Sequence, residues 1–336
     1  MSLEKVMLAH GGGGRATWEL IEGVFGKYFA DPVLLMGDDA AELTIAGGRL
    51  AFATDSFVVS PPFFPGGDVG RLAVCGSVND LLMKGARPLY LSAAFIIEEG
   101  TSLDDLRRIA LSMSEAASEA KIRIVACDTK VTARGQVDKI YIATSGVGLI
   151  PEGVHVGGGN GQPGDFIIVS GTLGEHGAAV LSQREGLGFE TELTSDCMPL
   201  SDIVLSLFES GAEIHVLRDP TRGGIASTLN EIAIRSKVDI VVDESEIPLS
   251  TPVKKICELL GLDPLALPSE GKFLAFIAPK SLDIALKTLR AHPKGRNARV
   301  IGRVTGASEG RVFLTSFSGV QRVLPMPWGE LIPRIC

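Results

Sequence analysis

The sequence predicts a two-domain α/β protein with mixed sheets and an extended C-terminal tail. With 336 residues, 45% of them hydrophobic, the chain can form two cores. Both halves alternate strand and helix patterns joined by glycine-rich and acidic turns, which is typical of α/β domains. The densest glycine run, residues 157–164, marks the expected boundary. We therefore expect domains at 1–156 and 157–324, followed by a tail at 325–336.

The first domain opens with the glycine loop His10–Arg15, followed by a predicted helix with Trp18 and Ile21 on one face. Backbone amides before a helix suit phosphate, but this loop lacks the Lys-Ser/Thr ending of a P-loop. An ordinary flexible loop is the alternative. Further along, the patterns predict strands at 50–55, 89–97, 122–130 and 141–149, and helices at 70–85 and 102–120.

Acidic residues recur near the ends of these first-domain elements. A strand that begins at Leu34 is expected to run directly into two of them, and another acid lies beside Asn79 in an otherwise poorly charged helix. Taken singly, such residues are usually turn formers or face solvent. Their recurrence predicts carboxylates gathered at one edge of a sheet, where Mg²⁺ and phosphate can bind. The acids are Asp38, Asp39, Asp55, Asp80 and Asp128.

The second domain contains a possible anion-binding segment. Arg218-Asp219-Pro220-Thr221-Arg222-Gly223-Gly224 precedes a predicted helix at 225–234. Backbone amides and guanidinium groups make this segment suitable for phosphate, and a tight turn held by an Arg–Asp pair is the alternative. Later, Pro268–Lys272 interrupts an apolar stretch with an acid, Glu270, and a base. The predicted strands of this domain include 165–170, 300–304 and 311–315.

The tail ends in a thiol. Prolines between residues 325 and 333 favour an extended chain over a helix, and termini are usually mobile unless they are tied down. The α-carboxylate of Cys336 disfavours the thiolate, while Arg334 favours it. Such a tail can carry a nucleophile into a pocket. The alternative is an apolar end that only docks on the surface.

Charge and cysteine usage exclude several functional classes. The formal net charge is −8, and 32 Lys and Arg spread among 40 acidic residues leave no basic stripe for nucleic acid. Five cysteines, without a Cys-x-x-Cys pair, indicate reduced thiols in a cytoplasmic protein and argue against a zinc site or disulfides. The N-terminus lacks a signal-peptide pattern, and no apolar run approaches the ~20 residues of a membrane span.

Five segments in combination resemble the aminoimidazole ribonucleotide synthetase (PurM-like) superfamily, and the resemblance runs from His10 to Cys336. They are Gly37-Asp38-Asp39-Ala40-Ala41, Thr54-Asp55, Asn79-Asp80-Leu81, Cys127-Asp128-Thr129 and Asp219-Pro220-Thr221-Arg222-Gly223-Gly224. The ending Pro333-Arg334-Ile335-Cys336 is similar to one branch only, the carbamoyl dehydratases of hydrogenase maturation. One departure is Ala126-Cys127, where relatives often carry two glycines.

This resemblance implies a fold and an activity. The fold is a PurM-like architecture with an N-terminal mixed sheet that pairs in a homodimer, near whose interface the nucleotide binds, and a C-terminal α/β sandwich. A carbamoyltransferase of the HypF type places a carbamoyl group on Cys336. ATP, with Mg²⁺, phosphorylates the carbamoyl oxygen, and loss of phosphate leaves a thiocyanate. The cyanide passes to a HypC–HypD-type complex that assembles the iron centre of nickel-iron hydrogenase. Neither nucleic acid nor a membrane is an expected partner.

The resemblance also implies roles for individual residues. Cys336 would carry the reacting group, and Lys130 and Glu270 would flank the docked tail, where Glu270 takes protons from the carbamoyl nitrogen. The implied Mg²⁺ ligands are Asp38, Asp55, Asp80 and Asp128, with Asp39 in place of, or beside, Asp38. The implied nucleotide or phosphate contacts are Asn79, Thr129, Asp219 and Arg222.

Two other functions remain open at the level of sequence. The first is a different ATP-dependent enzyme of the superfamily, either a selenophosphate synthetase or a thiamine-phosphate kinase. The former usually carries a reactive Cys or selenocysteine with a Lys in the N-terminal glycine segment, which His10–Arg15 lacks, and the latter has no use for a terminal cysteine. The second is a non-catalytic scaffold that docks partners through its tail.

Overall fold

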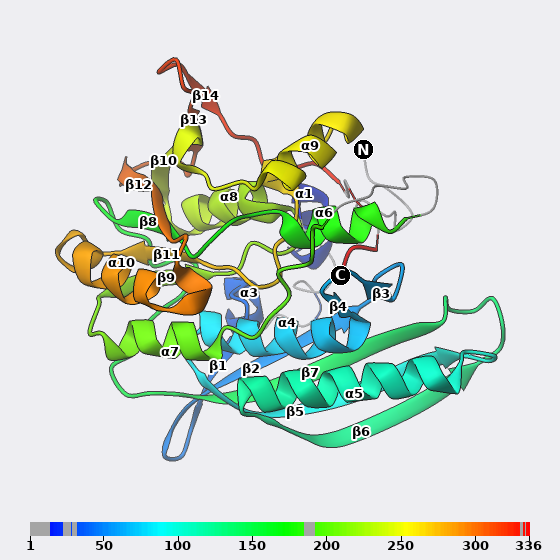
Figure 1. Ribbon diagram of the computed structural model, residues 1–336. Coiled ribbons are helices and arrows are strands. Elements are labelled where there is room, and N and C mark those ends of the chain that lie inside the picture. The colour runs from blue at the N-terminus through cyan, green and yellow to red at the C-terminus, as the bar shows by residue number, and fades with distance from the viewer. Residues whose placement is uncertain (1–13, 23–27, 29–31, 185–191, 330–331, 333) are drawn as a thin grey trace.

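Two β-sheets, one from each half of the chain, form the framework of the structure (Figure 1). The computed structural model describes residues 14–22, 28, 32–184, 192–329, 332 and 334–336. One sheet has five strands and the other has seven. Each combines parallel with antiparallel pairs, which confirms the predicted mixed-sheet α/β class.

The first sheet has one face covered by two helices (Figure 1). The elements of this half are α1 (Arg15–Leu20), α3 (Pro32–Met36), β1 (Ala41–Ile45), β2 (Gly48–Phe57), β3 (Phe63–Phe64), β4 (Gly67–Asp68), α4 (Val69–Met83), β5 (Arg87–Glu98), α5 (Leu103–Ala120), β6 (Arg123–Thr132) and β7 (Ile140–Ile150). The strand order is β1-β2-β7-β5-β6, and only β5 and β6 are parallel. The parallel pair requires a crossover, which α5 provides.

Helices α4 and α5 confirm the sequence patterns. Ser102 caps α5, because its hydroxyl accepts hydrogen bonds from the backbone amides of Asp104 and Asp105. Helix α4 ends just before Gly85, as predicted. Almost every residue of α4 is buried, because the helix packs on the first sheet and also contacts α7 (Ser201–Glu209) and β9 (Ile214–Arg218) of the second half. Any charged group near its end therefore lies between the two halves.

The strand predicted from Leu34 is wrong. Residues 32–36 form the short helix α3, because Pro32 suits the first turn of a helix and the left-handed backbone of Gly37, with φ of +57°, ends it. The acids Asp38 and Asp39 thus lie between α3 and β1. The other two strand acids do not end their strands either, since β2 and β6 continue to Phe57 and Thr132.

The second sheet has the order β14-β13-β10-β12-β8-β11-β9. Its strands are β8 (Phe166–Val169), β9, β10 (Val238–Asp243), β11 (Leu274–Ile277), β12 (Arg299–Ala307), β13 (Val312–Thr315) and β14 (Gln321–Val323). The helices are α6 (Glu175–Ser182), α7, α8 (Gly224–Ser236), α9 (Thr251–Leu260) and α10 (Leu282–Ala291), with 3₁₀ turns η3 (Glu244–Glu246), η4 (Pro264–Ala266), η5 (Pro279–Ser281) and η6 (Pro293–Gly295). The predicted strands at 165–170, 300–304 and 311–315 are confirmed as β8, β12 and β13.

The two halves share apolar packing. One hydrophobic core cluster joins Leu72 and Val78 of α4 with Leu207 of α7 and with Ile335 of the tail. The described helices include none that is long and apolar enough to cross a membrane.

Candidate active site

A cavity of about 410 Å³ lies where both halves of the chain meet. Its wall combines Trp18 of α1 and the loop after α3 with α4, the loop after β9 and α8. The lining includes six acidic residues and three arginines, so negative charge is in excess. The acidic and basic lining residues are Glu22, Asp38, Asp39, Asp55, Asp80, Arg218, Arg222, Glu231 and Arg235.

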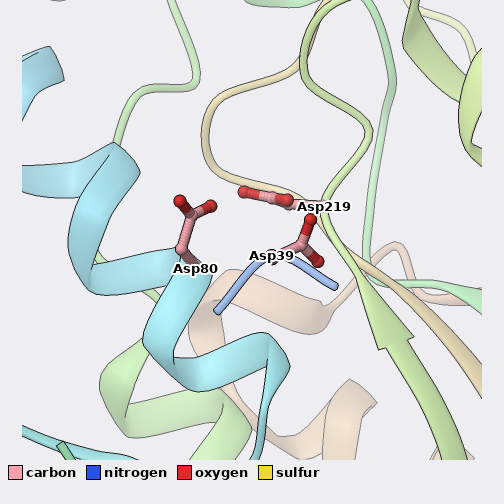
Figure 2. Close-up of side chains that lie close together, drawn as sticks. All are labelled: Asp39, Asp80 and Asp219. Atoms are coloured by element: carbon pink, nitrogen blue, oxygen red, sulfur yellow. The ribbon is translucent and has the colours of Figure 1, made fainter. Parts of the chain in front are cut away.

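Three carboxylates converge beside this cavity (Figure 2). One oxygen from each of Asp39, Asp80 and Asp219 lies within 4.8 Å of the others. Figure 2 shows Asp80 on α4, Asp39 on the loop between α3 and β1, and Asp219 directly after β9. The two halves of the sequence therefore contribute to one set of hard oxygen donors, the kind that Mg²⁺ prefers.

Burial and mutual repulsion shift the acidities of the three carboxylates. Burial raises the pKa of Asp39 and of Asp80 well above the usual value, and neighbouring acids add to the effect. Burial also raises the pKa of Asp219 to about 6. A cation that binds all three groups would offset this repulsion and favour their ionised forms.

Arg218 fixes the position of Asp39. Its Nε lies 2.6 Å from Asp39 Oδ1, its Nη2 lies 2.8 Å from Glu231 Oε2 and its Nη1 donates to the Gly37 carbonyl at 3.2 Å. The guanidinium is buried, yet its pKa is raised, because these surrounding acids outweigh the effect of burial. One planar group thus ties α8 and β9 to the loop that carries Asp39.

Asp38 makes a different set of contacts from its neighbour. Its Oδ2 lies 2.6 Å from Lys84 Nζ, and its Oδ1 accepts a hydrogen bond of 2.8 Å from the Gly158 amide. Asp38 reaches the cavity wall, but its oxygens are committed to α4 and to the segment between the sheets. Asp39, and not Asp38, therefore joins the carboxylate cluster.

The Asp38–Lys84 pair predicts a loss of stability on substitution. Lys84→Met should lower the free energy of unfolding by about 3 kcal/mol, because it leaves a nearly buried carboxylate without its cation. Denaturant unfolding at low ionic strength is the measurement. Arg107→Met, which removes an exposed pair with Asp104, should change stability by less than about 1 kcal/mol. Equal effects of the two variants would contradict this account of Lys84.

Arg222 connects the cavity to the C-terminus. Its Nη2 lies 3.7 Å from Asp55 Oδ1, and its side chain is 44% exposed. The pKa of Arg222 is raised, and the proximity of Cys336 is the largest cause, followed by burial, which opposes the shift, and then by Asp55. The last residue of the chain therefore lies next to a guanidinium on the cavity wall.

Glu270 is buried near the same group of charges. Burial raises the pKa of its carboxyl well above the usual value, Asp219 and Asp55 add to the shift, and Arg222 opposes it. Its Oε1 has no hydrogen-bond partner among the described residues. A buried carboxyl oxygen without a hydrogen-bond partner costs free energy, so this oxygen is available to a polar group that binds beside it.

Asn79 does not line the cavity. Its amide nitrogen donates to the carbonyls of Met198 and Glu270, both at 3.2 Å, and its Oδ1 accepts from the Leu200 amide at 2.9 Å. The side chain thus uses its donors and acceptor to hold the 198–200 segment and the Glu270 backbone against α4. The nucleotide contact expected of Asn79 stays a prediction.

The tail is docked in this structure. The Val58 amide donates to a terminal carboxylate oxygen of Cys336 at 3.2 Å, and the Ser60 amide donates to the Arg334 carbonyl at 3.0 Å. Arg184 Nη2 donates to the same Arg334 carbonyl at 3.1 Å, and Arg334 Nη1 pairs with Asp138 Oδ2 at 2.6 Å. Ile335 is buried and Cys336 is half-buried against the core. The tail therefore follows the end of β2 toward the cavity.

Three predicted site residues lie away from the cavity of their own chain. Asp128, Thr129 and Lys130 are exposed on β6, at the edge of the first sheet, and none of them is on the cavity wall. The Lys130 side chain forms no hydrogen bond or ion pair with any residue in the part of the chain that the structure describes, so the expected pair with Glu270 is not assembled within one chain. In the predicted phosphate loop, His10–Gly13 lie outside the described residues.

Several residues at or near the cavity have no clear sequence signal. Trp18 of α1 lines the cavity with Glu231 and Arg235 of α8, and Lys84, at the end of α4, reaches it only through Asp38. Only the fold brings them together. The Arg235 guanidinium lies 5.2 Å above the Trp18 ring and donates to the Met36 carbonyl. Lys84 is the C-cap residue of α4, where a cation is common, so its ion pair with Asp38 had no sequence signal of its own.

Comparison with known proteins places this geometry in a family. Residues 37–150 match the N-terminal domain of AIR synthase related proteins, and residues 162–315 match the C-terminal domain. The carbamoyl dehydratase HypE of Cupriavidus necator is 49% identical over 99% of this chain and 95% of its own length. That of Rhizobium leguminosarum is 47% identical with the same coverage. The chain belongs to the HypE family of carbamoyl dehydratases.

Solved structures of HypE share the fold. A HypE–HypF complex superposes with a TM-score of 0.87 at 46% identity, covering 92% of this chain and 99% of the other. HypE in complex with ATP gives 0.83 at 45% identity, with coverage of 99% and 100%. A thiamine-phosphate kinase structure, AaThiL, gives 0.71 at only 22% identity over 98% of this chain and 100% of its own, which is similarity of fold alone. HypE relatives thus favour the dehydratase over the kinase.

Proposed function

We propose that the chain carries its own substrate on its last residue. As a HypE-family enzyme it is an ATP-dependent carbamoyl dehydratase, which converts an S-carbamoyl group on Cys336 to a thiocyanate and so supplies cyanide for nickel-iron hydrogenase. One observation carries the assignment of Cys336: its charge is the largest influence on the pKa of Arg222, a residue that lines the cavity next to the carboxylate cluster, and the tail is docked by backbone hydrogen bonds at Val58 and Ser60. A tail that only covered the surface would not need to end at this cavity.

The reaction requires removal of one oxygen and two protons from the carbamoyl group. Phosphorylation turns the carbamoyl oxygen into a good leaving group, so the carbon–oxygen bond breaks with release of phosphate, while the nitrogen loses both protons and forms the triple bond. Glu270 lies buried in the same cluster of charges, and we assign it as the acceptor of one proton. Exclusion of water by the docked tail protects the phosphorylated group from hydrolysis.

ATP and Mg²⁺ fit the cavity. Carboxylates that repel one another without a cation, with the partly exposed Arg222 on the same cavity wall, suit a polyphosphate bound with a metal ion. We assign Asp39, Asp80 and Asp219 as the metal-holding set, with Asp55 beside it and Asp38 in support. Bound Mg²⁺ would neutralise charge on the transferring phosphoryl group.

Partners and location follow from the relatives and from the thiols. A relative was solved as a HypE–HypF complex, so we infer that a HypF-type carbamoyltransferase supplies the carbamoyl group. A HypC–HypD-type complex is the proposed acceptor of the cyanide. All five cysteines are free of disulfides, which suits the cytoplasm.

The first sheet supports a homodimer. Helices α4 and α5 cover one of its faces, whereas Phe52, Tyr90, Ile96 and Leu149 are each more than 40% exposed on its strands. Strand β6 adds exposed apolar residues at an unpaired edge. A monomer seldom exposes so broad an apolar surface, and a second copy of the same sheet would cover it. We propose that pairing brings Asp128, Thr129 and Lys130 to the partner's cavity.

The dimer predicts complementation between inactive variants. If Asp128 serves the partner's site, Asp80→Asn and Asp128→Asn should each be inactive, but co-refolded mixtures should recover about a quarter of wild-type turnover. Half of the dimers are then mixed, and each mixed dimer has one intact site. ATP turnover measured across mixing ratios is the test. No recovery in mixtures that contain heterodimer would show that Asp128 acts within its own chain or not at all.

The assigned activity is tested by intact-protein mass spectrometry. The chain is incubated with a HypF-type carbamoyltransferase, its substrates and ATP, and the modified site is located in the C-terminal peptide. A carbamoyl increment on Cys336 that loses one water only with hydrolysable ATP is the expected result. If Cys336 stays unmodified while a known HypE is labelled, the proposal is wrong and phosphate acceptors for a kinase should be screened.

Glu270→Gln should stall the reaction at the carbamoylated species. The amide is nearly isosteric but cannot accept the proton, so carbamoylation should be unchanged and water loss should fall by roughly 10²- to 10⁴-fold. Mass spectrometry of single-turnover samples separates the two species. Glu246→Gln, at an exposed 3₁₀ turn, is the matched control. Rapid water loss by the Glu270 variant would remove Glu270 as the base.

A further inference from the structure

His176 makes an unexpected contact with the tail. The ring is fully buried at the start of α6, with Nε2 2.8 Å from the Ile335 carbonyl and Nδ1 2.8 Å from Ser195 Oγ. A carbonyl can only accept, so Nε2 carries the hydrogen. Nδ1 then accepts from the Ser195 hydroxyl, which in turn accepts from the Cys197 amide at 3.1 Å. Burial lowers the pKa of His176, which agrees with a neutral ring.

This contact holds the peptide that leads directly to the reactive residue. The Arg334 carbonyl and the terminal carboxylate of Cys336 accept hydrogen bonds from amides of the 58–60 segment, and the intervening carbonyl of Ile335 faces His176. The last peptide group is therefore held from two sides. In Figure 1 the C-terminus lies between α6 and the hairpin of β3 and β4, in agreement with these contacts. Phe64 of that hairpin packs edge-on against the ring at 5.2 Å, so the imidazole has little freedom to turn.

The partner of His176 also belongs to the segment that holds Glu270. Directly after Ser195, the side chain of Asp196 accepts from the Glu270 amide at 3.1 Å and lies 3.1 Å from Lys272 Nζ. The backbone there is close, since a Cβ at Gly271 would lie 1.8 Å from the Asp196 carbonyl oxygen. Two adjacent residues thus fix the imidazole that holds the tail and the loop that carries the acid.

We propose that His176 is a positioning residue, whose Nε2–H holds the Ile335 carbonyl and sets the register of the C-terminal peptide relative to Glu270. The inference rests on the proposed role of Cys336 as carrier. It adds that productive docking depends on a side-chain hydrogen bond to the tail backbone, and not only on apolar packing of Ile335. Because the donor reaches a backbone atom, the contact is independent of what the thiol carries.

Two substitutions separate this role from simple core packing. His176→Gln can retain a donor near the position of Nε2, whereas His176→Leu removes it at comparable volume. Loss of one neutral hydrogen bond should raise the undocked fraction of the tail about fivefold. Cys336 would then react faster with iodoacetamide, measured on the C-terminal peptide without ATP or partner. Cys127, exposed on β6, reports reagent activity within the same molecule. His155→Leu, at an exposed histidine, is the matched control.

The expected result is faster alkylation of Cys336 in the Leu variant, near wild-type alkylation in the Gln variant, and no change at Cys127. After carbamoylation, the Leu variant should also lose water several-fold more slowly while binding ATP normally. Unchanged alkylation of Cys336 in the Leu variant would overturn the proposal. Equally faster alkylation of Cys336 in both variants would also overturn it, because it would indicate that packing alone holds the tail. Faster alkylation with unchanged water loss in the Leu variant would overturn it too, because His176 would then dock the tail without positioning it. Failure of the proposed function is distinguishable, because it would leave wild-type Cys336 without any carbamoyl group.

Discussion

Cys336→Ala is expected to abolish formation of thiocyanate completely while ATP still binds. The thiol is the only atom of the tail that can carry the carbamoyl group, whereas the cavity is lined by residues far from the tail in sequence. Isothermal titration with a non-hydrolysable ATP analogue and Mg²⁺ should therefore give an affinity within about threefold of wild type. Mass spectrometry after incubation with the carbamoyltransferase should show no increment on the chain.

The matched control is Cys127→Ala, which removes the other cysteine that is not buried. It should retain carbamoylation and water loss. Loss of ATP binding in Cys336→Ala would contradict a nucleotide site that is built independently of the tail. Persistent thiocyanate formation in that variant would mean that another group carries the substrate.

Asp80→Asn is expected to lower ATP-dependent water loss by roughly 10²- to 10³-fold, the effect of removing one preorganised charged group from an active site. Asp80 joins Asp39 and Asp219 at the cavity, so its loss should also weaken the binding of Mg²⁺. Half-maximal turnover should then require a higher Mg²⁺ concentration. Carbamoylation of Cys336 should be unaffected, because it occurs on the tail. Single-turnover assays across Mg²⁺ concentrations are the measurement.

Asp38→Asn is the informative comparison, since Asp38 is the neighbour that pairs with Lys84. Asp38→Asn should lower the free energy of unfolding while leaving the dependence of turnover on Mg²⁺ concentration close to that of wild type. If Asp38→Asn shifted the Mg²⁺ dependence as strongly as Asp80→Asn, the assignment of the metal-holding set would be wrong.

Asp80→Asn should stabilise the protein against unfolding when no metal is present. Burial raises the pKa of Asp80 in the folded state, so the folded protein binds more protons than the unfolded chain. The buried Asp80 carboxylate destabilises the folded protein once it is ionised. This destabilisation is absent at pH below the ordinary carboxylate range and grows as pH rises through the raised pKa. Thermal unfolding in chelator should therefore show Asp80→Asn gaining on wild type between about pH 4 and pH 7. A constant difference across that range would contradict the shift.

Local patterns were sufficient for most elements, because they depend on near neighbours. The Ser102 cap, the end of α4 before Gly85 and the alternating strand at 141–149 follow from capping and periodicity. The strand expected from Leu34 failed because five apolar residues have no distinguishing period, and Pro32 and Gly37 favoured a single helical turn.

The sequence by itself determined the fold class, the family and the presence of acids and a terminal thiol, because motifs and periodicity are local properties of the chain. Only the tertiary structure separated Asp38 from Asp39, committed the Asn79 amide to the 198–200 backbone and placed His176 on the tail. It also left Asp128 and Lys130 at an exposed sheet edge. Each of these outcomes depends on which distant groups meet a side chain. Adjacent residues can face opposite directions, and no spacing along the chain records the partner that burial selects.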